Sequence, residues 1–445
     1  MSPASGVRVA VFPIDAIGHV NPLLPIVRAL AGHPDVAQVR SFAPASLGPA
    51  LTAAGACHVP VEAAAPSSSV PVGVSELAYR SFVEPLAVSE RMTARAAEFR
   101  PDVVLYDVFC VHGLVAARAL GVPSASLVTF PGYGALGEQF VLQHASREPA
   151  SAGRRYRALY GWDPLEEGLL PVLFPSPDLS IVTAIESMSR RVDAVTAPRL
   201  HAALSRYEGT CAFVGPSVGE AGPHDRSDRS FPYDVLDAAR RAGRSIVLFS
   251  LGTVLTGFRF GSPVGGAPSG RAYLLALLDH LIGALGDRDD VLVVVATGSS
   301  LTAADEPAWP GNFVVRAFLP QRELLNGYAD AFITHHGTSS TAESLLAGVP
   351  MISVPGVGDQ LPNAEIAIAG GAAVALWDPH DVFATVNADL LAKAVRQVLH
   401  DPSYRTACLT LRDRMTAAGG ARRAAGLVVS LGRRSSRSGP IGSRS

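Results

Sequence analysis

The sequence predicts an α/β protein of two domains, each built around a Rossmann-like parallel β-sheet. Short apolar runs rich in β-branched residues alternate with longer helical patterns through both halves of the 445 residues. Strands that are apolar along their whole length and alternate with helices are typical of parallel sheets covered on both faces. A stretch rich in Gly, Pro, Ser and charge, roughly residues 215–232, separates the halves and predicts an interdomain linker.

In the first half, three apolar segments are the predicted strands: residues 7–13, 101–107 and 122–130. A helix is expected over residues 21–33, with Asn21 as the N-cap and Pro22 as the first helical residue. A second helix is expected over residues 111–121, where Gly121 stops it.

The second half repeats this alternation. Its predicted strands are residues 245–253, 291–297, 312–318, 330–336 and 350–355, with helices that include residues 271–286 and 339–347. In parallel sheets ligands bind beyond the carboxyl ends of the strands, so the site is expected there. The Gly/Pro-rich segment 257–270 is predicted to be a long loop, either a mobile lid or a tolerated insertion.

Composition excludes several classes of protein. The net charge is −2, so there is no broad electrostatic case for binding nucleic acid or an anionic membrane. No apolar run approaches the roughly 18 residues that a membrane span requires, and the N-terminus lacks a signal peptide pattern. The four cysteines form no CxxC pair and predict free thiols. We therefore expect a cytoplasmic protein without integral membrane association, and the oligomeric state stays open.

A phosphate-binding turn is predicted where the strand at 330–336 meets the helix at 339–347. The first turn of a helix leaves backbone N–H groups unpaired, and a phosphate accepts them. Gly337 permits close backbone approach, and Ser339 and Ser340 add small hydroxyl donors. Residues 340–343 also form an S-x-x-E capping box, which requires no ligand. Two adjacent histidines, His335 and His336, point to opposite faces of a strand, so no metal site is expected.

Four strings together resemble a known signature: FLPQ at 318–321, HHGTSSTAES at 335–344, GVPMISVP at 348–355 and DQLPNA at 359–364. They are similar to the nucleotide-sugar signature of family 1 glycosyltransferases, a family that includes bacterial macrolide and other antibiotic-tailoring enzymes. The resemblance implies a GT-B fold, in which two Rossmann-like parallel-sheet domains face each other across a cleft.

The resemblance also implies the role of each part of the chain. Residues 1–214 would form the acceptor-binding domain, 215–240 the linker and 241–431 the domain that binds the nucleotide-sugar. Residues 432–445, which have no apolar periodicity, would be a disordered tail.

In the donor site, the resemblance places four residues at the nucleoside. Phe318 stands where the family usually has a tryptophan that stacks on the base, and a phenylalanine also stacks, with less area. Leu319 would offer backbone groups to the base edge, and Gln321 would lie near the nucleoside. Glu343 would bind the ribose.

Other matching positions contact the diphosphate and the sugar. The diphosphate residues implied are His335, Gly337, Ser339 and Ser340, together with Gly252 and Thr253 of the SLGT string. Asp359 and Gln360 would bind the donor sugar. The co-substrate would be a UDP-sugar or dTDP-sugar, with no other cofactor.

The string DAIGHVNP at 15–22 resembles the family motif that carries the catalytic base, and His19 is the matching residue. A position just before a helix keeps an imidazole neutral, so it can accept a hydroxyl proton. Asp107, at the end of the strand 101–107, is the family-matching carboxylate that would stabilise the imidazolium. Three aromatic residues, Phe109, Phe130 and Tyr133, are candidates for contact with an apolar acceptor.

The predicted function is therefore inverting, metal-independent transfer of a sugar from a UDP- or dTDP-sugar to a hydroxyl of a small apolar natural product. Two alternatives remain: another GT-B sugar-nucleotide enzyme, such as an epimerase, and a non-catalytic glycosyltransferase-like partner or sensor. A dinucleotide oxidoreductase is disfavoured because no G-x-G-x-x-G follows the first strand. The sequence does not select the nucleobase, the sugar or the acceptor, or O- against N- or C-glycosylation.

Overall fold

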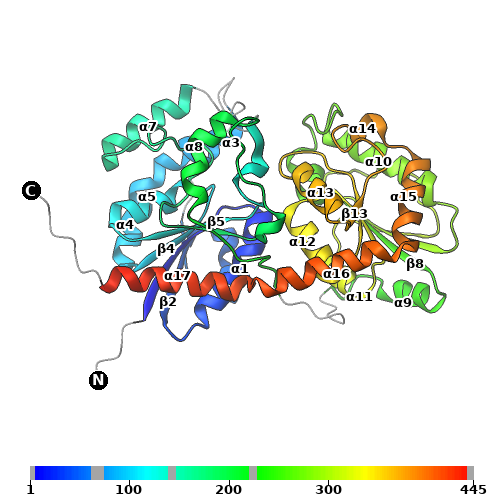
Figure 1. The fold of residues 1–445 in the computed structure, drawn as a ribbon, viewed down its shortest axis with the longest axis horizontal. Coiled ribbons are helices and arrows are strands. Elements are labelled where there is room, and N and C mark those ends of the chain that lie inside the picture. The colour runs from blue at the N-terminus through cyan, green and yellow to red at the C-terminus, as the bar shows by residue number, and fades with distance from the viewer. Residues whose placement is uncertain (1–5, 62–74, 139–146, 220–227, 438–445) are drawn as a thin grey trace, which may run out of the picture. The chain divides into compact units, whose positions relative to one another are not determined.

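A computed structural model describes residues 6–61, 75–138, 147–219 and 228–437 (Figure 1). The chain divides into two compact units: residues 1–219 with 417–445, and residues 220–416. Each unit contains one parallel sheet, as the alternating pattern predicts.

The sheet of the first unit has seven parallel strands in the order β3-β2-β1-β4-β5-β6-β7. These strands are β1 (Val7–Phe12), β2 (Val36–Ala43), β3 (Cys57–Pro60), β4 (Val103–Asp107), β5 (Ser124–Val128), β6 (Leu179–Val182) and β7 (Cys211–Phe213). Every residue of β4 and β5 is buried, which explains their continuous apolar sequence. The strand order reverses between β1 and β4, where ligands of such sheets bind.

The helices of the first unit are α1 (Ile17–Ala31), α2 (Gly48–Ala53), α3 (Glu76–Ala78), α4 (Ser89–Phe99), α5 (Val111–Leu120), α7 (Arg147–Tyr160), α8 (Pro198–Glu208) and α17 (Gly420–Arg437). Short helical turns are η1 (Ala45–Leu47), η2 (Tyr79–Val83), η3 (Glu84–Val88), η4 (Tyr133–Leu136) and η5 (Glu186–Met188). Helix α5 ends at Gly121 with φ 62°, as predicted.

Helix α1 begins five residues earlier than predicted, at Ile17 instead of Pro22. Its N-cap is Ala16, whose carbonyl accepts the N–H groups of His19 and Val20. Asn21 and Pro22 therefore lie inside the helix, where Pro22 omits only one backbone hydrogen bond. The consequence is that His19 lies in the first turn of α1 rather than ahead of it.

The sheet of the second unit has six parallel strands in the order β10-β9-β8-β11-β12-β13. They are β8 (Ser245–Ser250), β9 (Val291–Ala296), β10 (Phe313–Arg316), β11 (Ala331–Thr334), β12 (Met351–Ser353) and β13 (Ala373–Val374). The helices are α9 (Tyr233–Arg241), α10 (Gly270–Leu285), α11 (Gln321–Gly327), α12 (Thr338–Ala347), α13 (Gln360–Ala369), α14 (Val382–Thr385), α15 (Ala388–His400) and α16 (Pro402–Ala417), with a turn η6 (Val254–Phe258).

The boundaries differ from the expected ones at both ends of the second unit. The expected linker, 215–240, is shorter, because α9 already packs Tyr233 and Leu236 into this unit; its residues 220–227 lie outside the described part. Helix α17, red in Figure 1, packs in the first unit against α1, β1 and β4. Its apolar face buries Ala424 and Val428. The helix continues to Arg437, within the expected tail.

The segment 257–270 is folded against its own unit. Val264 and Ala267 are buried and form a small antiparallel bridge. Ser269 caps the start of α10 by accepting the N–H of Ala272. These contacts favour a packed connection over a mobile lid. Among the described residues, none of the helices is long and apolar enough to cross a membrane.

Candidate functional site

The loops that follow β8, β10, β11 and β12 carry the residues predicted to bind the donor. All four loops leave the carboxyl ends of parallel strands, so they lie at one edge of the sheet. The neighbouring strands β8, β11 and β12 supply the middle of this edge.

The turn between β11 and α12 leaves the start of the helix open. Helix α12 begins at Thr338, its N-cap is Gly337, and no side chain accepts a hydrogen bond there. The alternative capping box at 340–343 is therefore wrong, because Ser340 is already the third residue of the helix. A helix N-terminus without a side-chain cap presents its first N–H groups and partial positive charge to a ligand.

His335 lies buried beside this helix start. Its Nδ1 atom is 3.3 Å from the carbonyl oxygen of Ser250 at the end of β8. A Cβ atom on Gly252 or Gly337 would lie 2.4 Å or 2.5 Å from His335 Nε2, so both glycines are required for the ring to fit. Burial lowers the pKa of His335 to about 4, and the ring is neutral at physiological pH.

His336 has a structural role in this turn. It is fully buried and adopts φ 60°, a backbone conformation that is costly for a residue with a Cβ. Its Nδ1 is 3.2 Å from the Thr341 hydroxyl and its Nε2 is 2.7 Å from the Ser353 hydroxyl. The carbonyl of His336 accepts from Asn363 Nδ2. His336 therefore fixes the turn that opens the helix start.

Two predicted nucleoside residues and one predicted diphosphate residue are joined by hydrogen bonds. Gln321 Nε2 donates to Ser340 Oγ at 3.2 Å and to Glu343 Oε2 at 2.7 Å. Burial raises the pKa of Glu343, against the opposing effect of the Gln321 hydrogen bond. Phe318 is 61% exposed at the end of the β10 loop, an unusual place for an aromatic side chain and one suited to stacking.

Asp359 is fixed by two neighbours. Its Oδ2 atom accepts from the Thr338 hydroxyl at 2.6 Å and from Asn363 Nδ2 at 3.0 Å. Gln360, by contrast, is buried, and its side-chain oxygen accepts the backbone N–H groups of Gly356 and Val357. The side-chain carbonyl of Gln360 therefore stabilises the loop that follows β12.

The remaining predicted donor residues lie in the same loops. Thr253 is exposed just after Gly252, which has φ 67°. The Leu319 carbonyl accepts the Gln321 N–H, and Ser339 is the second, half-buried residue of α12.

In the first unit, the structure brings His19 and Asp107 together. His19 Nδ1 lies 2.8 Å from Asp107 Oδ2, and Asp107 is 2% exposed. The other carboxylate oxygen, Oδ1, accepts the backbone N–H of Phe109. Thr129, at the end of β5, was not predicted, yet its Oγ1 is 3.0 Å from the same His19 nitrogen. The ring orientation is thus fixed by residues from α1, β4 and β5.

All three candidate acceptor residues belong to the apolar core of the first unit. Phe130 and Tyr133 are buried, and the Tyr133 hydroxyl is 2.9 Å from Ser180 Oγ. Phe109 packs edge-on against His19, with ring centroids 5.2 Å apart. Of the three, Phe109 is the residue that borders the His19 ring. Buried aromatic side chains with regular spacing look alike in sequence whether they fill a core or line a site.

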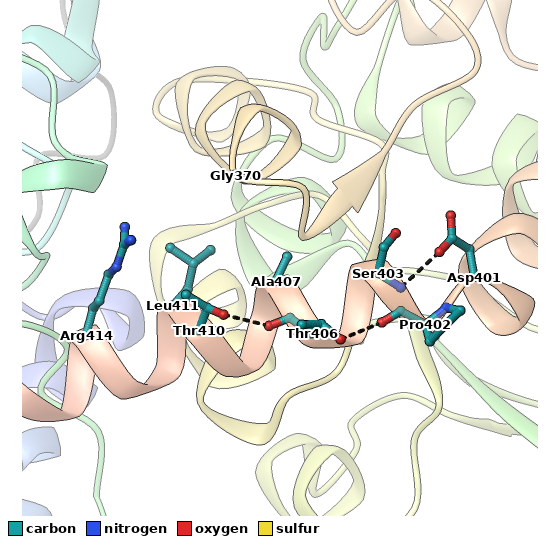
Figure 2. Close-up of a pocket in the computed structure, with 9 residues that line it drawn as sticks. All are labelled: Gly370, Asp401, Pro402, Ser403, Thr406, Ala407, Thr410, Leu411 and Arg414. Carbon is teal, nitrogen blue, oxygen red and sulfur yellow. Dashed lines mark hydrogen bonds between the residues drawn. The ribbon is translucent and has the colours of Figure 1, made fainter.

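Two other features bear on ligand binding. Within the described part of the chain, no group of three or more His, Cys, Asp or Glu side chains is placed to hold a metal ion. A surface groove runs along α16, between Asp401 and Arg414, and is bordered by Gly370 (Figure 2). None of the predicted site residues lines this groove.

Known proteins resemble this chain in sequence and in fold. Residues 300–414, which contain the donor-side loops after β10, β11 and β12, match the family model "UDP-glucoronosyl and UDP-glucosyl transferase". An oleandomycin glycosyltransferase from Streptomyces antibioticus is 29% identical over 98% of this chain and 94% of its own length.

Solved structures share the fold over nearly the whole chain. The glycotransferase of kitacinnamycin is 25% identical, covers 96% of this chain and 99% of its own, and has a TM-score of 0.71. The glycosyltransferase VinC, solved in complex with dTDP, has 20% identity, a TM-score of 0.64 and coverage of 96% and 100%. Two parallel-sheet units with such neighbours define a glycosyltransferase of the GT-B fold. In sequence, the chain is similar to family 1 of these enzymes.

The packing around His335 generates a prediction for Gly252→Ala. The new methyl group would meet the His335 ring, and φ 67° costs a residue with a Cβ about 1–2 kcal/mol. We expect weaker binding of UDP and dTDP, measured by calorimetry, and a lower melting temperature. Gly257→Ala is the matched control, because a Cβ there meets nothing within 4 Å. Wild-type nucleotide affinity in Gly252→Ala would remove Gly252 from the site.

Proposed function

We propose that this glycosyltransferase moves a sugar from a UDP- or dTDP-sugar to a hydroxyl group of a small apolar natural product, with inversion at the anomeric carbon. The observation that carries the proposal is the His19–Asp107 pair, with 2.8 Å between Nδ1 and Oδ2. A buried carboxylate that accepts from one imidazole nitrogen is the arrangement expected of a general base and its partner.

The pair determines which nitrogen of His19 is basic. A carboxylate accepts a hydrogen bond, so His19 Nδ1 carries the hydrogen and Nε2 carries the lone pair. We assign Nε2 as the atom that removes the acceptor proton. The acceptor oxygen then forms a bond to the anomeric carbon while the bond from that carbon to the diphosphate oxygen breaks. The diphosphate leaves with the electron pair, and Asp107 stabilises the imidazolium.

On the donor side, the open start of α12 and His335 support diphosphate binding. Negative charge grows on the diphosphate as it leaves, and preorganised N–H groups aimed at such charge lower the barrier. We assign the exposed Phe318 ring to stacking on the nucleobase. Glu343 is assigned to the ribose, and Asp359 to a hydroxyl of the sugar, since Thr338 and Asn363 hold its carboxylate.

The acceptor is assigned from weaker features. Phe109 borders His19 and offers an apolar surface next to the base. The oleandomycin and kitacinnamycin enzymes are similar to this chain over nearly its whole length, which supports a natural-product acceptor. The dTDP complex of a protein with the same fold supports a pyrimidine nucleotide as the leaving group.

The first prediction of this proposal is selective nucleotide binding. UDP or dTDP should bind in calorimetric titrations, whereas ADP and NAD should bind much more weakly, because the site holds a pyrimidine diphosphate. Ser340→Ala should weaken the binding, since Ser340 lies in the first turn of α12 and is held by Gln321. Equal or tighter binding of NAD would contradict the donor assignment.

The second prediction concerns the base. His19→Ala should lower the turnover number by about 10²- to 10⁴-fold, the usual contribution of a general base, and leave nucleotide affinity unchanged. Turnover is measured by mass spectrometry with UDP-glucose and dTDP-glucose against a panel of hydroxylated aromatic and macrolactone acceptors. His33→Ala is the control, because His33 lies just beyond the other end of α1. Full activity in His19→Ala would refute the assignment.

The third prediction concerns Thr129. Thr129→Val keeps the shape but removes the oxygen 3.0 Å from His19 Nδ1, and should lower turnover by about 3- to 10-fold, the value of one hydrogen bond. Thr129→Ser should restore the rate. The control is Thr183→Val, a buried threonine whose hydroxyl donates to the Val128 carbonyl. An unchanged rate in Thr129→Val would show that Asp107 alone orients the ring.

A further inference from the structure

We infer that His335 binds the donor diphosphate as an imidazolium, so that each nucleotide that binds takes up one proton and holds it against the leaving group. The inference rests on the proposed function, because it concerns the same donor site. It adds a movable positive charge to a site described so far by fixed dipoles.

Before the nucleotide binds, the contacts of the His335 ring determine its tautomer. Its Nδ1 lies 3.3 Å from the Ser250 carbonyl oxygen, which only accepts hydrogen bonds. Nδ1 must therefore carry a hydrogen. A neutral imidazole has one N–H group, so Nε2 carries a lone pair. The ring is neutral because burial lowers the pKa of His335 to about 4.

The Nε2 atom of His335 lies close to two glycines. Gly252 on one loop and Gly337 on the other lie so close that a Cβ on either would be 2.5 Å or less from this atom. Gly337 is also the N-cap of α12, so Nε2 borders the helix start where the diphosphate is proposed to lie. The lone pair on Nε2 and a phosphate oxygen are both hydrogen-bond acceptors, so they would repel each other. Protonation of Nε2 turns this contact into a charge-assisted hydrogen bond.

The charge of the segments around His335 also bears on diphosphate binding. The segments 250–256, 335–342 and 353–361 contain no Lys or Arg, so they offer the diphosphate no fixed cation. His336 does not supply one, since both of its ring nitrogens face hydroxyl groups and burial lowers its pKa to about 3.

Asp359 lies in the last of these segments and Glu343 directly follows the second, and they are hydrogen-bonded to Thr338 and Gln321 respectively. A carboxylate near the ring favours an imidazolium, so neither residue opposes uptake of a proton by His335.

Linkage gives the sign of the pH effect. The diphosphate raises the pKa of His335 above its value of about 4 in the free protein. Between the free and bound pKa values, binding takes up one proton, and affinity falls about tenfold for each unit that the pH rises. Above the bound pKa, both uptake and pH dependence disappear. During transfer the proton stays on Nε2 as charge grows on the leaving oxygen, and it is released when the nucleotide product leaves.

The test is calorimetry of UDP and dTDP binding in buffers with different ionisation enthalpies. The slope of the observed enthalpy against the buffer enthalpy counts the protons taken up. At about pH 7 the terminal phosphate, with a pKa of about 6, is mostly ionised, and its own titration is subtracted. We expect roughly 0.5 to 1 proton per nucleotide at this pH, and affinity that falls as the pH rises.

Substitution of histidines identifies the residue that takes up the proton when the nucleotide binds. In His335→Gln, whose amide donates without a charge, uptake should vanish and affinity should become independent of pH. His112→Gln is the matched control, because His112 is another histidine whose pKa burial lowers to about 4, in the first unit. Should His335→Gln fail to fold, ¹⁵N spectra of the histidine-labelled wild type provide the second measurement. Addition of UDP should then move one Nε2 resonance from the unprotonated to the protonated range.

The outcomes separate the inference from the function. Binding of UDP or dTDP without proton uptake would overturn the inference and leave the donor site in place. Uptake that persists in His335→Gln would also overturn it and transfer the proton to another group, such as Glu343. No binding of either nucleotide would refute both the inference and the proposed function.

Discussion

The proposed donor site depends on the backbone turn between β11 and α12. His336 holds a left-handed conformation that costs a residue with a Cβ about 1–3 kcal/mol, so surrounding contacts must compensate. They do so through both ring nitrogens, which face the hydroxyls of Thr341 and Ser353, and through its carbonyl, which accepts from Asn363. Because the ring is buried and neutral, these bonds stay the same across the physiological pH range. The turn places Gly337 as N-cap and leaves the start of α12 without a side-chain cap.

A helix start without a side-chain cap, as in α12, is unusual. Helices commonly satisfy their first N–H groups with Ser, Thr, Asp or Asn at the N-cap, and this chain has suitable side chains nearby. Thr338 instead donates to Asp359, and Ser340 accepts from Gln321. Both hydroxyls are thus engaged with side chains of neighbouring loops. The positive end of α12 remains available for an anion, while the same side chains connect the proposed diphosphate region to the proposed sugar and nucleoside regions.

The sequence predicted the two parallel sheets, and the residues it predicted for the donor lie beyond the carboxyl ends of strands, because buried strands and strand-to-helix turns have local signatures. It predicted the pairing of His19 with Asp107 only through family resemblance, since residues from α1 and β4 meet through tertiary structure. Features that depend on packing were missed. Helix α1 starts before Asn21, because the Ala16 carbonyl accepts its first bonds. Thr129 reaches His19 only through the adjacency of β4 and β5, and Tyr133 points into the core.

The two site histidines show how one tautomer serves two purposes. In both, Nδ1 donates to an oxygen and Nε2 carries the lone pair, but the oxygen belongs to a carboxylate for His19 and to a neutral carbonyl for His335. A carboxylate stabilises the imidazolium by a full charge, so His19 can accept a proton from a neutral hydroxyl. The Ser250 carbonyl offers only a partial charge, so His335 requires the ligand to supply the rest. The proposed base and the proposed diphosphate contact therefore differ in which partner stabilises the imidazolium, the protein in one case and the substrate in the other.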